Sequence, residues 1–407
     1  MVSLVGSNLI KVKEINKSKI LQTLFFYGPI SRIDIARKTM LTPPTITSNI
    51  TELIENGIIM EVVDQEEKFS VTQVSLGRKP ILLDFVPDSL FTVGVDWGPS
   101  GVYFCVSGIK GDIIAKNHIK PFTNELDYMV KMTKEGIIDL LLKNNIKNEK
   151  IIGVGVGIPG FIEGDNGIVK YSPVFKWSDI KLTNILQNVL ELDVAIENNV
   201  RLMAVAETYK PGAKQSGIFA YVYVSRGIAA AIIIDNRMLK GSLYGAGEIG
   251  HMTVEPNGPK CNCGKYGCLE TISSESAILN KVKSVLKNND DTILNEIVKD
   301  PENPKISEVL SAFSANDLAA VKIMRECVKY LGMSVANMIN IINPKFVMFD
   351  GNIFKDKRIC DELVENIWKH TYIIKDNEIS FEFKPHIDEY CAIGAAAYAM
   401  NKFFYKK

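Results

Sequence analysis

Apolar residues recur at helical spacing along the first sixty positions of the chain. They mark one face of a helix that ends at Gly28-Pro29, and of another that starts after Thr42 and ends at Gly57. Between these helices, Ser31 opens a short helix, with Asp34 three residues later in a near capping box. The apolar positions are Ile20, Leu21, Leu24 and Phe25 in the first helix, and Ile46, Ile50, Leu53 and Ile54 in the last. Three helices in this order, with a tight turn before the last, predict a helix-turn-helix unit.

The last of these helices carries short hydroxyls and an amide opposite its apolar side, a set that can contact phosphates and base edges. A hairpin is expected next, from residues 58–63 and 70–76, and Gly77-Arg78-Lys79-Pro80 follows it. An arginine in such a wing can enter a narrow minor groove, and the alternative is a polar linker turn. The candidate DNA contacts are Thr42, Thr45, Thr47, Ser48, Asn49, Arg78 and Lys79. Residues 1–85 are therefore predicted to form a winged helix-turn-helix domain.

From Phe91 onward, buried strand patterns alternate with long helical ones, which is typical of layered α/β domains. Strands are expected within residues 91–108, 151–160, 193–199, 217–235 and 345–351. Helices are expected at residues 125–144, 179–190, 200–209, 274–287, 315–342 and 390–403.

Charge separates the N-terminal segment from the rest of the chain. Lys+Arg and Asp+Glu both number 47 overall, yet residues 1–50 hold seven basic against two acidic residues. A basic head on a neutral body favours DNA binding, and the alternative is a solvated basic face. No secretory pattern and no apolar run of about 18 residues occur, so we expect no membrane partner. Four scattered cysteines in apolar or helical contexts favour a cytoplasmic protein with reduced thiols.

Three of the seven cysteines and one of the four histidines fall in one stretch of twenty residues. Thiolates beside an imidazole suit Zn²⁺, so Cys261, Cys263, Cys268 and His251 are candidate ligands. The alternatives are a redox dithiol at Cys261 and Cys263, or a catalytic zinc that keeps a water.

Carboxylates and amides also stand at strand ends and loops. Asn198-Asn199 follow a strand, a glycine-rich loop ends at Gly160, and Glu248 and Glu270 flank the cysteines. A polyol requires such groups, because each hydroxyl both donates and accepts a hydrogen bond. The alternative is that these side chains are ordinary exposed loop residues.

The segments GEIGHMTV and CNCGKYGCLE, together with IENN, GIPG and the upstream helix-turn-helix, resemble the ROK family of repressors, open reading frames and sugar kinases. The order of head and body is similar to the repressor branch, that of xylose and N-acetylglucosamine repressors. The resemblance implies an actin-like, ribonuclease-H-like body at residues 86–407, with two α/β lobes and a sugar cleft. It implies one structural zinc per chain, in the loop 248–270, held by His251, Cys261, Cys263 and Cys268. The implied sugar contacts are Gly160, Asn198, Asn199, Glu248, His251 and Glu270.

The chain departs from the kinases of that family at every phosphate-handling position. The first phosphate loop reads Asp96-Trp97-Gly98-Pro99-Ser100, the second reads Ser225-Arg226-Gly227, and Asp350-Gly351 replaces a glycine pair. Glycines matter there because they let backbone N–H groups approach phosphate oxygens. Asn199 takes the place of the general base, and an amide cannot accept the proton. We therefore expect no catalytic residue and no enzyme activity.

These features predict a sugar-responsive repressor that binds operator DNA as a homodimer or higher oligomer and a monosaccharide as effector. The alternatives are a sugar kinase with a regulatory DNA-binding head, and a repressor controlled by a protein partner.

Overall fold

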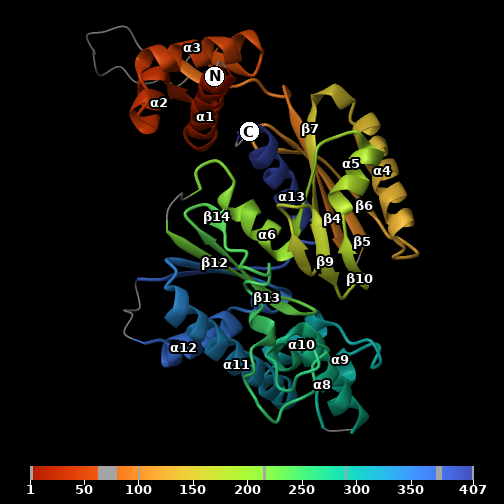
Figure 1. Cartoon of the computed structure of the whole chain (residues 1–407). Coiled ribbons are helices and arrows are strands. Elements are labelled where there is room, and N and C mark those ends of the chain that lie inside the picture. Colours follow the sequence, from red (N-terminus) through yellow and green to blue (C-terminus); the bar gives the residue numbers. More distant parts are fainter. Residues whose placement is uncertain are drawn as a thin grey trace, which may run out of the picture. The chain divides into compact units, whose positions relative to one another are not determined.

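The computed structural model describes residues 3–62, 80–99, 101–213, 217–288, 291–372 and 378–405, with side chains from residue 11 onward (Figure 1). The chain forms two units: Met1–Lys214 with Asp388–Lys407, and Gln215–Ile387. In the described residues, no helix is both long and apolar enough to cross a bilayer.

The first unit begins with a helical head that carries a small antiparallel sheet of order β1-β3-β2. Its elements are α1 (Ser3–Tyr27), β1 (Ile30–Ser31), α2 (Arg32–Thr39), α3 (Pro43–Glu55), β2 (Ile59–Val62) and β3 (Leu82–Phe85). Ser31 caps α2 as predicted, because its Oγ accepts the backbone N–H of Asp34 at 3.2 Å. Ile20, Ile46 and Ile50 are buried at the centre of the head, so the helical spacing predicted its core correctly.

Strand β2 pairs with a strand that the sequence did not predict. The strand that pairs with it is Leu82–Phe85, in a register that places Ile59 opposite Phe85, and β3 also pairs with β1. The expected strand at residues 70–76 lies outside the described residues, as do Arg78 and Lys79. Leu83 and Phe85 are buried, so the strand after Pro80 contributes to the head and is no linker. The head sheet ends at Phe85.

A five-stranded sheet forms the centre of the rest of the first unit, in the order β11-β7-β4-β5-β6. Its strands are β4 (Phe91–Gly98), β5 (Gly101–Gly108), β6 (Ile113–Ile119), β7 (Ile151–Ile158) and β11 (Val194–Asn198). Helices α4 (Leu126–Lys143) and α5 (Leu182–Leu190) cover one face, and α13 (Tyr390–Met400) covers the other, with α6 (Asn199–Thr208) against it (Figure 1). A short turn, η2 (Asn148–Lys150), precedes β7, and a small sheet joins β8 (Phe161–Glu163), β9 (Ile168–Ser172) and β10 (Trp177–Ile180).

Helix α13 lies very close to its neighbours. A Cβ at Gly94 of β4 would lie 1.8 Å from the carbonyl oxygen of Ala392, and one at Gly155 of β7 would lie 2.0 Å from that of Ala395. A Cβ at Gly394 would likewise lie 1.8 Å from the carbonyl oxygen of Leu202 in α6. Side chains larger than hydrogen would therefore separate α13 from both the sheet and α6.

The second unit contains a sheet of order β14-β13-β12-β15-β16. Its strands are β12 (Ile218–Val224), β13 (Ile228–Ile234), β14 (Arg237–Met238), β15 (Phe346–Asp350) and β16 (Ser380–Lys384). Its helices are α7 (Glu270–Ser273), α8 (Glu275–Lys287), α9 (Leu294–Ile297), α10 (Ile306–Ser314), α11 (Leu318–Ile342) and α12 (Lys357–His370), with the short turns η3 (Ile249–His251) and η4 (Asn352–Lys355). In each unit, the strands of the large sheet, numbered along the chain, follow the order 3-2-1-4-5. The body is thus two lobes of one topology, which is the expected actin-like architecture.

Candidate functional site

Four soft donors meet in the loop formed by residues 248–270, here called the cysteine loop. One ligand atom each of His251, Cys261, Cys263 and Cys268 lies within 4.8 Å of the other three. Sγ of Cys261 lies 3.6 Å from Nδ1 of His251, and Sγ of Cys263 lies 3.6 Å from Sγ of Cys268. Thiolates on a tetrahedral zinc, with Zn–S bonds of about 2.3 Å, are separated by about 3.8 Å. The donor set and its spacing therefore fit a zinc ion with four protein ligands.

Short bridges hold the backbone of the cysteine loop. Thr253 pairs with Cys268, and Lys260 pairs with Tyr266, so the two ends of the loop lie side by side. Gly267 has a φ of 65°, and a Cβ there would lie 1.5 Å from the carbonyl oxygen of Glu255. A glycine is therefore required at this position.

The thiols differ in their tendency to ionise. Burial raises the pKa of Cys268 to about 12 and also raises the pKa of Cys261. The backbone N–H of Lys265 lowers the pKa of Cys263. A cation is thus needed to keep all three sulfurs as thiolates near neutral pH. Because Nδ1 of His251 faces the sulfurs, Nε2 is left to bind a second partner.

Three of the predicted sugar contacts belong to the second unit, on neighbouring segments of the cysteine loop. Glu248 precedes η3, His251 ends it, and Glu270 begins α7. The backbone N–H of Leu269 donates to the carbonyl of Met252 at 2.9 Å, so the segments that carry His251 and Glu270 are adjacent. A pocket of about 420 Å³ opens beside Glu270. Its wall includes Arg226, Thr271, Ser274 and Asn280. Hydroxyl, amide and charged groups of this kind suit a hydroxyl-rich ligand.

In the first unit, Asn198 links the other two predicted sugar contacts, Gly160 and Asn199. Its Oδ1 accepts the backbone N–H groups of Val200 at 3.0 Å and Arg201 at 3.2 Å, which caps α6. Its Nδ2 donates to the carbonyl of Gly160 at 3.0 Å. Asn199 makes no side-chain hydrogen bond to the described residues, so its amide can serve a ligand. Gly160, Asn198 and Asn199 are called the asparagine turn below.

A buried ion pair supports the asparagine turn. Glu197 and Arg201 have side chains only 0% and 4% exposed, and Oε1 of Glu197 lies 2.9 Å from a guanidinium nitrogen of Arg201. The same Oε1 accepts the backbone N–H of Asn198 at 2.9 Å. Removing one partner of such a pair leaves an uncompensated buried charge, at a cost of about 3–5 kcal/mol. The pair therefore fixes the end of β11 relative to the start of α6.

Carboxylates of the chain itself bind both glycine-containing turns of the second unit. Oε2 of Glu270 accepts the backbone N–H of Ile228 at 3.1 Å, next to the turn Ser225-Arg226-Gly227. The Glu275 carboxylate accepts the backbone N–H of Asn352 at 3.3 Å, and the hydroxyl of Ser225 lies 3.5 Å from it. Burial raises the pKa of Glu275. Two backbone N–H groups beside these turns, those of Ile228 and Asn352, are thus already bound by the chain's own acids.

Asp350 adds a further negative charge at the end of β15. It is fully buried, and the phenol of Tyr221 donates to it. Nδ1 of His386 lies 2.9 Å from its carboxylate, and Nζ of Lys384 lies 3.5 Å away. The position that the sequence comparison assigned to a nucleotide-binding glycine therefore holds a charged, hydrogen-bonded cluster.

The segment that corresponds to the first phosphate loop, residues 96–100, lies at the end of β4. Trp97 is fully buried and its Nε1 donates to the hydroxyl of Thr133 in α4 at 3.0 Å. Asp96 is only 5% exposed, and Ser100 lies outside the described residues. Trp97 thus anchors this end of the strand to the helix layer.

In the head, the predicted DNA contacts differ in exposure. Thr42, Thr47 and Ser48 are exposed on α3, and Thr45 is half-buried. Asn49 is instead only 4% exposed, and its Nδ2 donates to the carbonyl of Thr45 at 2.8 Å. One position along a helix turns a side chain by about 100°, which moves Asn49 towards the core side with Ile50. Its placement on the polar face beside Ser48 is therefore corrected.

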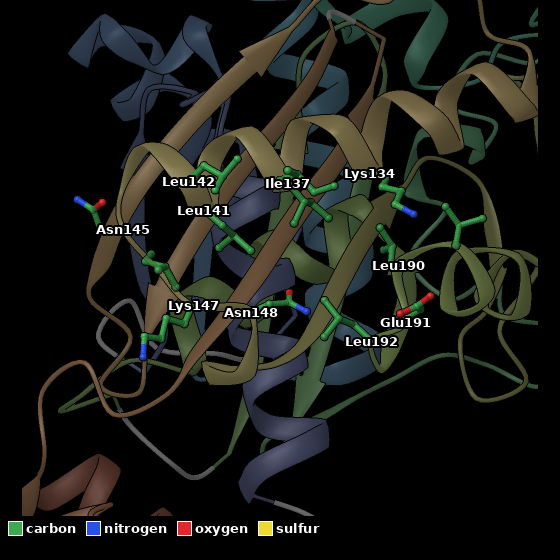
Figure 2. Close-up of a pocket in the computed structure, with 13 residues that line it drawn as sticks. Lys134, Ile137, Leu141, Leu142, Asn145, Lys147, Asn148, Leu190, Glu191 and Leu192 are labelled. Carbon is green, nitrogen blue, oxygen red and sulfur yellow. The ribbon is translucent and has the colours of Figure 1, made fainter.

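A second pocket, of about 590 Å³, lies along α4 and the end of α5 (Figure 2). Ile137, Leu141, Leu190 and Leu192 line it, with Lys134 and Lys147 at its rim. None of the predicted site residues lines it.

Several site residues were absent from the sequence prediction. Glu275 follows Ser274, which caps α8 by accepting the backbone N–H of Ala277, so the sequence indicated a helix start and no site. Its contact with Asn352 spans 77 positions, which local patterns cannot reveal. Glu197 stands in the IENN motif, and Arg201 follows four residues later, a spacing at which an ion pair could have been predicted.

Comparison with known proteins places these features in a family. The ROK family model matches residues 92–402. The chain is 28% identical over 393 residues to the xylose repressor of Caldicellulosiruptor bescii, covering 96% of each chain. It is 27% identical over 391 residues to the DNA-binding transcriptional dual regulator NagC of Escherichia coli, covering 96% of this chain and 93% of NagC.

Solved structures support the same fold. A ROK family transcriptional regulator described as a homologue of the E. coli MLC protein matches with a TM-score of 0.83 and 23% identity, over 97% of each chain. The ROK glucokinase of Streptomyces griseus, solved with glucose and AMPPNP, matches with a TM-score of 0.61 and 22% identity, over 75% of this chain and 98% of its own. The repressor match therefore includes the head, and the kinase match leaves a quarter of the chain uncovered. The family model covers most of the chain, and the chain belongs to the ROK family.

Proposed function

We propose that the protein is a sugar-responsive transcriptional repressor, which binds operator DNA with its head and a monosaccharide with its body. One observation carries this proposal: a winged helix-turn-helix head precedes a ROK body whose phosphate-side turns bind the chain's own carboxylates. Relatives named as repressors of xylose and N-acetylglucosamine systems support it. The protein is proposed to act in the cytoplasm and to control genes for carbohydrate use.

On the DNA side, the exposed hydroxyls of Thr47 and Ser48 are proposed to meet base edges, with Thr42 and Thr45 nearer the phosphates. Arg78 and Lys79 remain proposed contacts of the wing. A single small head makes few phosphate contacts, so the active form is proposed to be a homodimer or a higher oligomer that reads paired half-sites.

On the sugar side, the proposed contacts come from two groups of residues, one in each unit. The asparagine turn supplies the amide of Asn199, and the cysteine loop supplies Glu248, Nε2 of His251 and Glu270. Asn198 and Gly160 contribute mainly by positioning, because most of the hydrogen-bonding capacity of Asn198 is used within the turn. Xylose and glucose are the first sugars to test.

The metal is proposed to be a structural Zn²⁺, one per chain, bound by His251, Cys261, Cys263 and Cys268. Four protein ligands leave no open coordination position, so no water would be activated. The ion would fix the orientation of His251 and hold the loop that carries the two glutamates. A redox dithiol at Cys261 and Cys263 is disfavoured by the presence of Cys268 and His251 in the same cluster.

No phosphoryl transfer is proposed. Transfer from a nucleotide depends chiefly on positioning the phosphates, which requires free backbone N–H groups and positive charge. Glu270 and Glu275 instead accept backbone N–H groups there, and Asp350 is held by Tyr221, Lys384 and His386. Asn199 also lacks the proton-accepting capacity of a carboxylate.

The test begins with an operator selected from random duplex DNA by the purified protein. Fluorescence anisotropy then measures its affinity with xylose, glucose or N-acetylglucosamine present. We expect one sugar to change the affinity by about 5- to 150-fold, the usual range of coupling between two sites. Ser48→Ala should relax half-site preference, whereas Ser307→Ala, which changes an exposed serine of the second unit, should leave it unchanged.

The two alternatives predict different outcomes. A repressor controlled by a protein partner would bind the operator with the same affinity at every sugar concentration. A kinase would release ADP in the presence of a sugar. Failure to select any DNA would contradict the repressor itself.

A further inference from the structure

Five aromatic side chains meet where the head contacts the body of the first unit. They are called the aromatic junction: Phe25 and Phe26 of α1, Phe85 of β3, Tyr209 after α6, and Tyr405 after α13. The ring of Tyr209 stacks on Phe25 with a centroid distance of 5.1 Å and an angle of 22°. Its edge meets Phe26 at 5.3 Å, and Tyr405 lies 5.9 Å away. Phe25 is 5% and Phe26 is 9% exposed, so the junction excludes water.

Hydrogen bonds also connect α1 with the body at this junction. The Gln22 side chain of α1 donates to the carbonyl of Tyr405 at 3.1 Å, and the hydroxyl of Ser18 donates to the same carbonyl. The phenol of Tyr405 donates to the carbonyl of Ile109 at 2.6 Å. The backbone carbonyl of Tyr405 therefore holds α1, and its side chain is anchored within the body.

Two helices connect the junction with the asparagine turn. Helix α6 begins at this turn, and α13 packs against α6. Asn198 caps α6, and Tyr209 follows its last turn, about 15 Å away for ten residues at 1.5 Å each. Close backbone contact at Gly394 holds α13 against α6, and α13 continues through a π-helical turn, η5 (Asn401–Tyr405), into Tyr405. A shift of the asparagine turn would therefore move the two junction tyrosines together.

One group in the junction is poorly satisfied. Tyr209 is 8% exposed, and its hydroxyl has no hydrogen-bond partner in the described part of the chain. Burial raises its pKa, so the hydroxyl stays protonated and remains a donor without an acceptor. A buried polar group in this state disfavours the arrangement that buries it.

We propose that α6 couples the asparagine turn to the DNA-binding head, and that the unpaired hydroxyl of Tyr209 keeps the docked head only marginally favoured over a released one. A ligand at the asparagine turn then needs little free energy to shift this balance, since the shift is limited by its differential affinity for the two states. The coupling of ligand binding to the head along α6 rests on the proposed function, whereas the docking equilibrium of the head at the junction is independent of it.

Hydroxyl-radical footprinting of the full chain without sugar tests the junction, because oxidation of Phe25 and Phe26 requires that the junction opens. Phe122, which is 84% exposed, reports the radical dose. Tyr209→Phe should slow the oxidation of Phe25 and Phe26, since the docking equilibrium gains a factor of roughly 5 to 100. Gln22→Ala, the matched control, should speed it, because the carbonyl of Tyr405 loses a donor from α1. Unchanged or faster oxidation in Tyr209→Phe overturns the proposal, and so does an unchanged rate in Gln22→Ala.

A second pair of variants tests the coupling along α6. Asn198→Ala removes the cap at the far end of the helix and should raise the oxidation of Phe25 and Phe26. Asn144→Ala, which removes a side-chain bond to Leu140 at the end of α4, should not. Equal rates in Asn198→Ala and the wild type overturn the coupling. If all four variants behave as expected but no monosaccharide changes the wild-type rate, the sugar response of the proposed function is contradicted and the junction is not.

Discussion

Single side chains occupy the turns on the proposed phosphate side of the body. Glu270 and Glu275 accept the backbone N–H groups of Ile228 and Asn352, and Asp350 is held by Tyr221, Lys384 and His386. Restoring one catalytic group is therefore not expected to restore catalysis.

Asn199→Asp tests this directly. It supplies the missing carboxylate, and a general base contributes about 10²–10⁴ in rate. We expect no ATP-dependent phosphorylation of any hexose or pentose by the wild type or the variant, measured by coupled ADP release. The variant should still bind sugar in a thermal-shift assay, with altered affinity. Turnover by the wild-type protein would contradict the proposed function.

Cys263→Ser tests the cysteine loop. Removing one of four ligands should lower the zinc content from about one per chain to near zero, measured by elemental analysis of the purified protein. Sugar affinity should fall, because the loop carries Glu248, His251 and Glu270, while the head stays folded. Cys360→Ala changes a cysteine of α12 outside the cluster and should keep its zinc. Full sugar affinity in metal-free protein would refute an organising role for the ion.

Among single residues, the sequence allowed prediction of groups whose members lie close together along the chain. Cys261, Cys263 and Cys268 stand within eight positions, so their gathering needed no fold. The partners of Asp350 show the opposite case: Tyr221 and His386 are distant in sequence and meet only because β12, β15 and β16 are neighbours in the sheet.

Among the elements, strong periodicity was a good guide. The expected helices at 274–287 and 315–342 correspond to α8 and α11, with ends that differ by up to three residues. Weaker patterns were missed: β6 alternates half-buried and exposed residues at a sheet edge, and β8 to β10 are three to five residues long. Helix α12 was also missed, although Ile359, Leu363 and Ile367 repeat at helical spacing in its sequence. Strand β3 was missed because Leu82–Phe85 follows Gly-Arg-Lys-Pro and resembles a linker.

A contact between two helices of the head makes its stability depend on pH. Glu52 of α3 lies 2.8 Å from Lys13 and 2.7 Å from Lys17 of α1, and hydrogen bonds from these lysines lower its pKa to about 2. Because the folded pKa is below the unfolded value, the stabilisation is fully present above about pH 4.5 and is lost as the pH falls towards 2.

Glu52→Gln should therefore reduce the hydrogen-exchange protection of the α3 amides at pH 7, and the difference from wild type should shrink by about pH 3. High salt should weaken the effect, since the groups are partly exposed. Glu55→Gln, on the same helix and without an ion pair among the described residues, is the control. Equal differences at both pH values would contradict this account.

For the whole molecule, the proposed dimer predicts a geometric rule. Two heads related by symmetry contact half-sites about one helical turn, 10–10.5 base pairs, or a multiple of it apart. Inserting five base pairs between the selected half-sites should reduce affinity strongly in a filter-binding assay, and inserting ten should restore part of it. Indifference to spacing would favour a monomer that reads a single half-site.

The two lobes share the strand order 3-2-1-4-5, yet no local pattern revealed this repeat in the sequence. The topology came from resemblance to a family, because strand order depends on pairings between distant segments.

The division of the chain also fixes an order of events during synthesis. Residues 215–387 form one unit, whereas the first unit combines residues 1–214 with residues 388–407. Most of the first unit is translated before the second unit. The second unit is nevertheless fully translated first, because the first unit still lacks residues 388–407 at that point. Tyr405 is translated only after both sheets, so the head emerges first but gains the Tyr405 part of its contact with the body last. A nascent chain that stops short of α13 would carry a DNA-binding head with nothing at the C-terminus to hold it.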